Sequence, residues 1–205
     1  MKNILKIIML SVISISTKAQ TPVIDIEDNQ GYDVNGAYYK DTKNQLNPFE
    51  GTYIYTNGTT SLKIVLQKKT MSTIPSHRFY EDMIIGEYQY IENGVEKRNT
   101  LNILNINYED KTRHGINGNL LITGTHLGCP DCGPTEKRIK GSLMDYVAHG
   151  LGNIQLRRIT INGKAAIKLN IYWEMREKKD GQVLIKPFIA PDDYVLIKEI
   201  PVGID

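Results

Sequence analysis

One short loop carries side chains whose types and spacing could do chemistry. It reads Cys129-Pro130-Asp131-Cys132 and has a glycine on each side. Two cysteines at this spacing can form a local disulfide, act as a redox pair, or supply two ligands to a metal ion. The sequence holds two cysteines in all, so a disulfide leaves neither unpaired. We therefore predict that Cys129 and Cys132 form a disulfide.

The redox and metal alternatives each lack a feature that such a site requires. A redox-active cysteine is typically activated by a helix N-terminus, whereas Pro134 and a strand-like run follow this loop. A zinc site would add His126 in the pattern His-x-x-Cys-x-x-Cys, but a closed site takes four ligands. His114 or His149 could complete it only by folding nearby. A metal or redox role for the cysteine pair is the second alternative, and we expect no metal and no cofactor.

The other polar residues form no catalytic pattern. All four histidines fall in predicted loops, where we expect solvent-exposed side chains: His77, His114, His126 and His149. Glu81 and Asp82 are adjacent acids, but neighbours on a strand point to opposite faces and do not share a proton. No serine lies in a Gly-x-Ser-x-Gly turn, and no phosphate-binding glycine loop is present. We predict a protein that is not an enzyme and has no catalytic residues.

Aromatic residues are the candidate ligand-binding group. Tyr53 and Tyr55, and likewise Tyr88 and Tyr90, are two residues apart on predicted strands, and Trp173 lies on the longest one. If these faces point into an unfilled barrel, they would line a pocket for an apolar or ring-bearing ligand. The alternative is that they pack the core, as aromatic residues commonly do.

Three of the five Asn-Gly pairs in the sequence indicate where the strands that position these residues turn. They are Asn57-Gly58, Asn93-Gly94 and Asn162-Gly163. Such a pair between two β-rich runs predicts a hairpin, because both turn residues must accept a positive φ. We expect the hairpin within 47–68 to be the first hairpin of the sheet, which the later strands extend. Residues 164–176 alternate apolar and polar side chains, the period of a strand, and residues 95–107 form one long strand or two.

The spacing of the turns predicts roughly nine or ten strands and almost no helix. A meander of this kind must bury one face, and closure into a barrel leaves no exposed edge strands. We predict an all-β fold, a single-domain antiparallel up-and-down β-barrel of about 8–10 strands. A two-layer β-sandwich is the alternative.

The N-terminus has the pattern of an export signal. Lysines precede a short apolar run, and Ala19 precedes the expected cleavage site. The run is too short to span a bilayer as a helix, so we expect no integral membrane span after cleavage. We predict a signal peptide over 1–19, a polar N-terminal segment over 20–46 and the barrel domain over 47–205. The protein would be exported to the periplasm, the cell surface or the medium.

The charge of the mature chain gives no reason to expect nucleic acid. The chain has 25 basic and 23 acidic residues, and the signal peptide would remove three basic residues and no acidic one. The mature chain would therefore carry a net charge near −1. A near-neutral chain lacks the basic surface that binds DNA, RNA or anionic lipid.

Three segments resemble an uncharacterised family of small secreted proteins from flavobacteria and their relatives, a domain of unknown function. They are Gly36-Ala37-Tyr38-Tyr39-Lys40-Asp41-Thr42, Asn47-Pro48-Phe49-Glu50-Gly51-Thr52-Tyr53 and Gly86-Glu87-Tyr88-Gln89-Tyr90-Ile91. The resemblance would cover most of the mature chain. It implies export and a β-rich fold, and it implies no activity.

The chain is also loosely similar to lipocalins and other calycins. Their first strand opens with an aromatic residue two positions after a glycine, as Gly51-Thr52-Tyr53 does here. The similarity implies that Tyr53 plugs the closed end of a barrel. It also implies that a late basic residue packs over Tyr53, the candidates being Arg157, Arg158 and Lys198. The C-terminal helix typical of lipocalins is missing.

Two functions follow from these predictions. The first is an exported, non-enzymatic β-barrel that binds a small apolar molecule or lipid. The alternative is a structural or interaction protein of the periplasm or cell surface without a ligand pocket. An open interior of ~300 Å³ or more would favour the first, and a filled interior the second. The sequence leaves the oligomeric state open.

Overall fold

The structure is a computed structural model that describes residues 21–28, 34–126, 128–145, 150–173, 189 and 193–200. The predicted signal peptide and His149 lie outside the described residues, and so does the side chain of Trp173. Within the described residues, no helix is long and apolar enough to cross a membrane.

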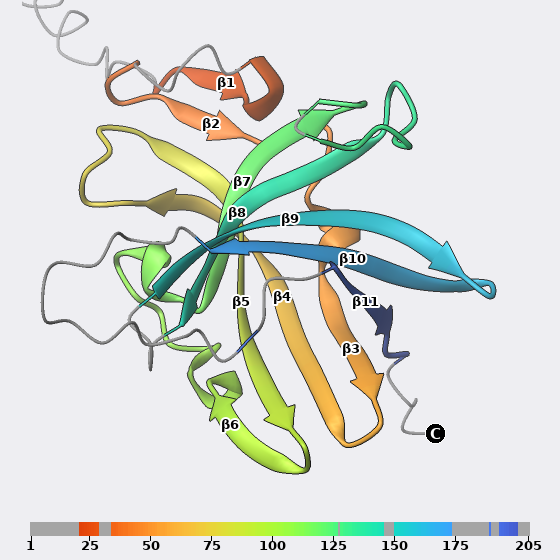
Figure 1. The fold of residues 1–205 in the computed structure, drawn as a ribbon. Coiled ribbons are helices and arrows are strands. Elements are labelled where there is room, and N and C mark those ends of the chain that lie inside the picture. The colour runs from red at the N-terminus through yellow and green to blue at the C-terminus, as the bar shows by residue number, and fades with distance from the viewer. Residues whose placement is uncertain are drawn as a thin grey trace, which may run out of the picture.

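Eight antiparallel strands close into a barrel (Figure 1). In chain order they are β3 (Gly51–Asn57), β4 (Thr60–Thr73), β5 (Tyr80–Glu92), β7 (Ile116–Thr123), β8 (Lys137–Asp145), β9 (Gly150–Ile161), β10 (Lys164–Trp173) and β11 (Asp193–Lys198). Each strand pairs with the next, and β11 returns to β3 through Ile197↔Ile54 and Lys198↔Tyr53. The predicted up-and-down barrel is confirmed, and its closure excludes the sandwich.

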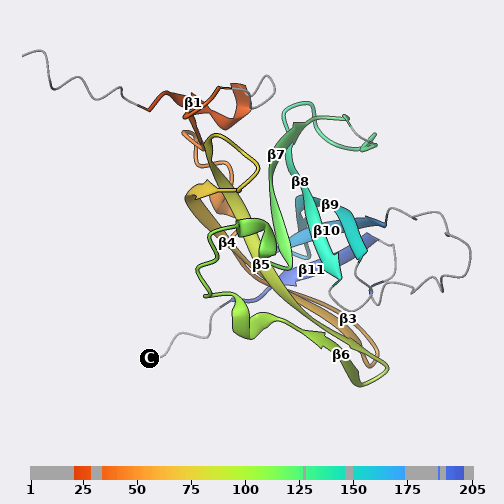
Figure 2. The same cartoon turned by 90° about the vertical axis from the view of Figure 1, so that its left-hand side faces the viewer.

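Short elements extend the barrel at two places. They are β1 (Val23–Asp25), β2 (Tyr38–Lys40) and β6 (Val95–Asn99), with 3-10 turns η1 (Ile26–Asp28), η2 (Asn47–Phe49), η3 (Leu101–Ile103) and η4 (Lys111–Arg113). β1 and β2 are parallel to the first residues of β5, and they lie at the opposite end of the molecule from the β5–β6 hairpin (Figures 1 and 2). The strand expected over 95–107 ends at Asn99, because the Asn99 side chain accepts the N–H of Leu101 and starts a 3-10 turn.

The three Asn-Gly pairs predicted to form hairpins all turn the chain, but not in the same way. Asn93 and Gly94 have φ of 52° and 77°, and Asn162 and Gly163 have 49° and 76°, so both residues of these turns take the expected positive φ. In the first hairpin Asn57 pairs with Thr60, which makes Gly58 the first turn residue, with a φ of 58°. A turn with glycine first fits the twist of a hairpin equally well.

Alternate side chains of the strands fill the barrel interior. On β4 the inward residues Leu62, Ile64 and Leu66 are at most 1% exposed. The cluster they form continues around the barrel through Tyr53, Tyr88, Tyr90, Ile116, Ile139, Leu143, Ile154, Leu156, Ile167, Leu169, Ile171, Tyr194 and Leu196. The interior is therefore a packed core, as is usual for a barrel of this size.

One end of the barrel is sealed by the residues that precede β3. Phe49 of η2 is buried there, and the Tyr53 hydroxyl donates to its carbonyl oxygen at 3.1 Å. Burial raises the pKa of Tyr53 to about 12. The Lys198 ammonium lies 5.5 Å from the centroid of the Tyr53 ring, so Lys198 is the late basic residue that packs over it. Gly51 leaves room for that lysine, because a Cβ there would lie 2.6 Å from Lys198 Cε.

Two buried aspartates attach the N-terminal segment to the barrel. Asp82 on β5 accepts the Tyr38 hydroxyl at 2.5 Å and the backbone N–H groups of Asp41 and Met71 at 3.0 Å. Asp41 Oδ2 in turn lies 2.8 Å from Lys68 Nζ. Burial and the Asp82 carboxylate raise the pKa of Tyr38. These contacts order β2 against β5, which matters for the site below.

Candidate functional site

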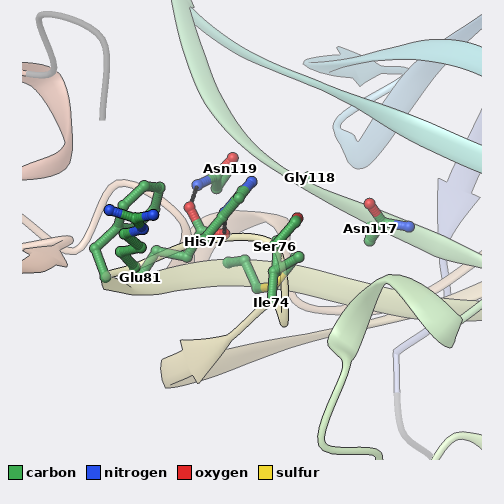
Figure 3. Close-up of a pocket in the computed structure, with 10 residues that line it drawn as sticks. Ile74, Ser76, His77, Glu81, Asn117, Gly118 and Asn119 are labelled. Carbon is green, nitrogen blue, oxygen red and sulfur yellow. Dashed lines mark hydrogen bonds and ion pairs between the residues drawn. The ribbon is translucent and has the colours of Figure 1, made fainter. Parts of the chain in front are cut away.

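A cavity of about 550 Å³ lies on the outer face of the barrel, where β5 and β7 separate (Figure 3). The two strands pair over three positions, from Ile84↔Gly118 to Gly86↔Ile116. Before Ile84, β5 pairs with β2 instead. The strands therefore diverge, and the connection 74–79 between β4 and β5 covers the fork. We name this cavity the seam pocket.

A β-bulge directs Asn119 to the seam pocket. β7 pairs with β8 through Gly118↔Gly141 and next through Leu120↔Lys140, so Asn119 is an inserted residue. A bulge bends its strand and re-aims the inserted side chain. Asn117 and Asn119 both line the pocket as a result, from either side of Gly118.

Glu81 is the buried acid of the seam pocket. The residue is 3% exposed, and its Oε2 accepts a hydrogen bond from Asn119 Nδ2 at 2.6 Å. Its Oε1 lies 3.5 Å from His77 Nδ1. Burial raises the pKa of Glu81, and the neighbouring His77 and Asn119 oppose this shift only in part. Figure 3 shows these three side chains grouped together, with Asn117 farther along β7.

The pocket offers both polar and apolar contacts. Its polar lining comes from Ser76, His77, Arg78, Glu81, Asn117 and Asn119. Ile74, Phe79 and Met83 supply the apolar part, and the His77 ring stacks on Phe79 with 4.7 Å between centroids. A concave site with an apolar wall and a few fixed polar groups is the usual form of a small-molecule site.

A comparison with protein-family models matches residues 1–199 to a family of unknown function (DUF6705). The chain belongs to this family. Comparisons with curated proteins and with solved structures gave no significant match. Membership confirms the predicted resemblance to a family of unknown function, and it assigns no ligand to the barrel.

The tyrosines that were predicted from the sequence to bind a ligand lie in the packed interior of this DUF6705 barrel. Tyr53, Tyr88 and Tyr90 are at most 4% exposed, and the Tyr88 hydroxyl donates to the Met144 carbonyl oxygen at 2.9 Å. Tyr55 is partly buried and meets Tyr194 edge-on at 5.0 Å. The Trp173 side chain is outside the described residues. Ligand binding by the five aromatic residues stays a prediction.

The predicted disulfide between Cys129 and Cys132 is present. Arg157 on β9 holds the loop, since its Nη1 donates to Asp131 Oδ2 at 2.7 Å and its Nε to Glu136 Oε1 at 2.6 Å. These contacts lower the pKa of both acids and raise that of Arg157. The described residues contain no free thiol and no group of three or more potential metal ligands.

His114 is buried, so the prediction of an exposed loop histidine is wrong there. Its Nδ1 lies 2.9 Å from Oε1 of Glu87, and both side chains are fully buried. The same oxygen accepts the N–H of Gly115 at 3.2 Å. The connection between β6 and β7 covers this outer face of β5, and Tyr108 packs edge-on against the imidazole at 5.0 Å. His126 is exposed and His77 half-exposed, as expected for loop histidines.

The grouping of Glu81, His77 and Asn119 was not predicted from the sequence. One signal was available, because Asn117-Gly118-Asn119 interrupts the apolar alternation of its strand and so indicates a bulge. The separation of Glu81 and Asp82 onto opposite faces was predicted, and the two acids do enter separate hydrogen-bond networks.

Replacing Glu81 with glutamine is expected to stabilise the fold at neutral pH. The folded protein holds the Glu81 proton more tightly than the unfolded chain, whose pKa is near 4.5. The free energy of unfolding of the wild type therefore decreases as the pH rises from 4.5 through the raised pKa of Glu81 in the folded state. Glu81→Gln removes the titrating group and with it this decrease. Urea unfolding at several pH values measures it, with the exposed Glu109→Gln as the matched control. If the free energy of unfolding depended on pH in the same way in Glu81→Gln and wild type, the raised pKa of Glu81 would be contradicted.

Proposed function

We propose that this protein is an exported, non-enzymatic binding protein, and that the seam pocket holds its ligand, a small hydroxylated molecule with an apolar face. The observation that carries the proposal is Glu81, a buried carboxyl on the wall of a 550 Å³ cavity that is oriented by Asn119. Carboxyl, amide and imidazole groups can each donate to or accept from ligand hydroxyls. The apolar wall of the pocket would contact the carbon face of the same molecule.

The packed interior favours a site outside the barrel. Interior side chains such as Ile64 and Leu169 are 0% exposed, whereas the seam pocket has the volume of an ordinary small-molecule site. A purely apolar ligand or lipid would leave Glu81 and Asn119 without new hydrogen bonds on burial, which is costly. The polar lining therefore supports a hydroxylated ligand.

The arrangement around His77 supports binding over catalysis. Glycoside hydrolysis usually requires two carboxyl groups, and Glu81 is the one carboxyl that we find lining this pocket among the described residues. Acyl transfer requires a nucleophile hydrogen-bonded to a base, and no hydroxyl or thiol in the described part of the chain bonds to His77 in this way.

Two features support export. The N-terminal sequence has the pattern of a cleaved signal, and the Cys129–Cys132 disulfide suits an oxidising compartment. Protein recovered from the periplasm or medium of an expressing cell is expected to begin at Gln20, which N-terminal sequencing checks.

The binding proposal is tested by NMR titration of the labelled protein with a panel of monosaccharides, polyols and hydroxy acids. We expect one class to shift amide signals of residues 74–83 and 117–119 in a saturable way. Because the lost hydrogen bonds are to buried groups, Asn119→Leu should weaken that binding about 10-fold or more. The matched control is Leu120→Asn, at the next and more exposed position of β7.

Two outcomes would contradict the proposal. Shifts confined to interior residues would indicate the apolar site expected from the sequence. The absence of any saturable shift would favour the interaction protein without a ligand pocket.

A further inference from the structure

A second feature, which shares no lining residue with the seam pocket, is a buried cation that makes no direct ion pair with any described residue. Arg138 on β8 is 2% exposed. Its guanidinium donates to Gln155 Oε1 and to the backbone carbonyl oxygens of Gly124 and His126, all of which are uncharged. Among the residues that the structure describes, its Nε has no hydrogen-bond partner. The charge of Arg138 helps to lower the pKa of Glu136, but the Glu136 carboxylate is hydrogen-bonded to Arg157 and not to Arg138. Charged side chains are almost never fully buried unless they are paired, so an anion in direct contact would stabilise the buried Arg138.

The strand register places further positive charges beside Arg138. Arg138 is directly opposite Arg157 on β9, and Arg157 is directly opposite Lys168 on β10. Like charges in directly opposite positions destabilise a sheet. Within the described residues, Arg157 is ion-paired with both Asp131 and Glu136, and Lys168 lies 2.8 Å from Asp193. Arg138 has no acid within ion-pair distance there and interacts with Glu136 only at longer range.

A cavity lies beside this row. It has a volume of about 130 Å³, and its lining includes Asn170 and three cations, Arg138, Arg157 and Lys168. Asp131 and Asp193 also line it, and they are ion-paired with Arg157 and Lys168. Since one water molecule occupies about 30 Å³ in the liquid, the cavity has room for a small oxyanion but not for a drug-sized ligand. Asn170 adds a second unsatisfied atom, because its buried Oδ1 accepts no hydrogen bond from the described part of the chain.

We propose that this cavity is a binding site for a small oxyanion that also carries a hydroxyl group, with hydrogen phosphate as the model. The anionic oxygens would pair with Arg138 and Lys168, and the hydroxyl would donate to Asn170 Oδ1. A single ligand would then give Arg138 a direct anionic partner and Asn170 Oδ1 a hydrogen-bond donor.

The site is tested with the full mature chain at about pH 6, where inorganic phosphate is a mixture of its singly and doubly charged forms, both of which carry a hydroxyl. Sodium phosphate, sodium sulfate and sodium chloride are titrated at matched ionic strength and followed by calorimetry and by the unfolding temperature. We expect saturable binding of phosphate that chloride does not reproduce, and about 10-fold weaker binding of sulfate, which has no hydroxyl to donate. Equal affinity for sulfate would overturn the hydroxyl-bearing anion.

Variants locate the binding. Lys168→Gln and Arg138→Gln are each expected to weaken phosphate binding about 10-fold or more, because charge-assisted hydrogen bonds are lost. Lys164→Gln, on the same strand at an exposed position, should bind as the wild type does. If Arg138→Gln does not fold, Lys168→Gln alone decides. Unchanged affinity in Lys168→Gln, or phosphate no better than chloride in the wild type, would overturn the proposal.

A parallel titration with phenyl phosphate distinguishes free phosphate from the phosphate group of a larger molecule. Tyr172 lines the same cavity and is 51% exposed, so its ring is available to a substituent on the phosphate. Tighter binding of the ester that is lost in Tyr172→Ala would assign a phosphate ester. Binding of inorganic phosphate alone would assign the free anion.

Discussion

Replacing Gly141 with alanine is expected to lower the free energy of unfolding by about 3 kcal/mol, the upper end of the usual cost of overpacking. A Cβ at this position would lie 2.9 Å from Gly118 Cα and nearer still to the carbonyl oxygen of Asn117. Both are backbone atoms of the neighbouring strand β7, so no flexible side chain can move aside. Urea unfolding followed by far-ultraviolet circular dichroism measures the loss.

The matched control for this prediction is Gly133→Ala. A Cβ at Gly133 would first meet Glu136 at 3.9 Å, which is an ordinary contact, so stability should change by less than about 0.5 kcal/mol. Because Gly141 pairs with Gly118 at the point where β7 leaves β5, Gly141→Ala should also shift the NMR signals of the seam pocket. Equal stabilities of the two alanine variants would contradict the close approach of β7 and β8.

Removing one member of the Glu87–His114 pair is expected to cost about 3–5 kcal/mol, as for other fully buried polar pairs. Among the described residues, the Glu87 carboxyl would keep only the N–H of Gly115 in His114→Leu, and its Oε2 has no partner there even in the wild type. In Glu87→Met the imidazole would lose its one hydrogen bond among the described residues. Urea unfolding of both single variants measures these losses.

The double variant tests whether Glu87 and His114 stabilise the fold as an interacting pair or independently of each other. Glu87→Met with His114→Leu replaces both polar groups by apolar ones of similar size, so its loss should be smaller than the sum of the single losses by at least about 1 kcal/mol. Additive losses would show that the two side chains do not depend on each other, contrary to the 2.9 Å contact.

The barrel could be predicted because its signals are local. A turn such as Asn162-Gly163 and the alternation that follows it depend on neighbouring residues, and both occur in the structure as expected. The site could not be predicted in the same way. Glu81 and Asn119 are 38 positions apart, and Glu87 and His114 are 27 apart, so no short pattern joins either pair.

The sequence by itself therefore determined the all-β class, the up-and-down order and the local Cys129–Cys132 pairing. Only the tertiary structure decided which polar side chains are buried. Glu81 and Glu87 both lie on the outer face of β5, where the alternation pattern assigns solvent exposure. They are buried because the connections 74–79 and 100–115 fold back over that face, and the placement of a connection depends on contacts between distant residues.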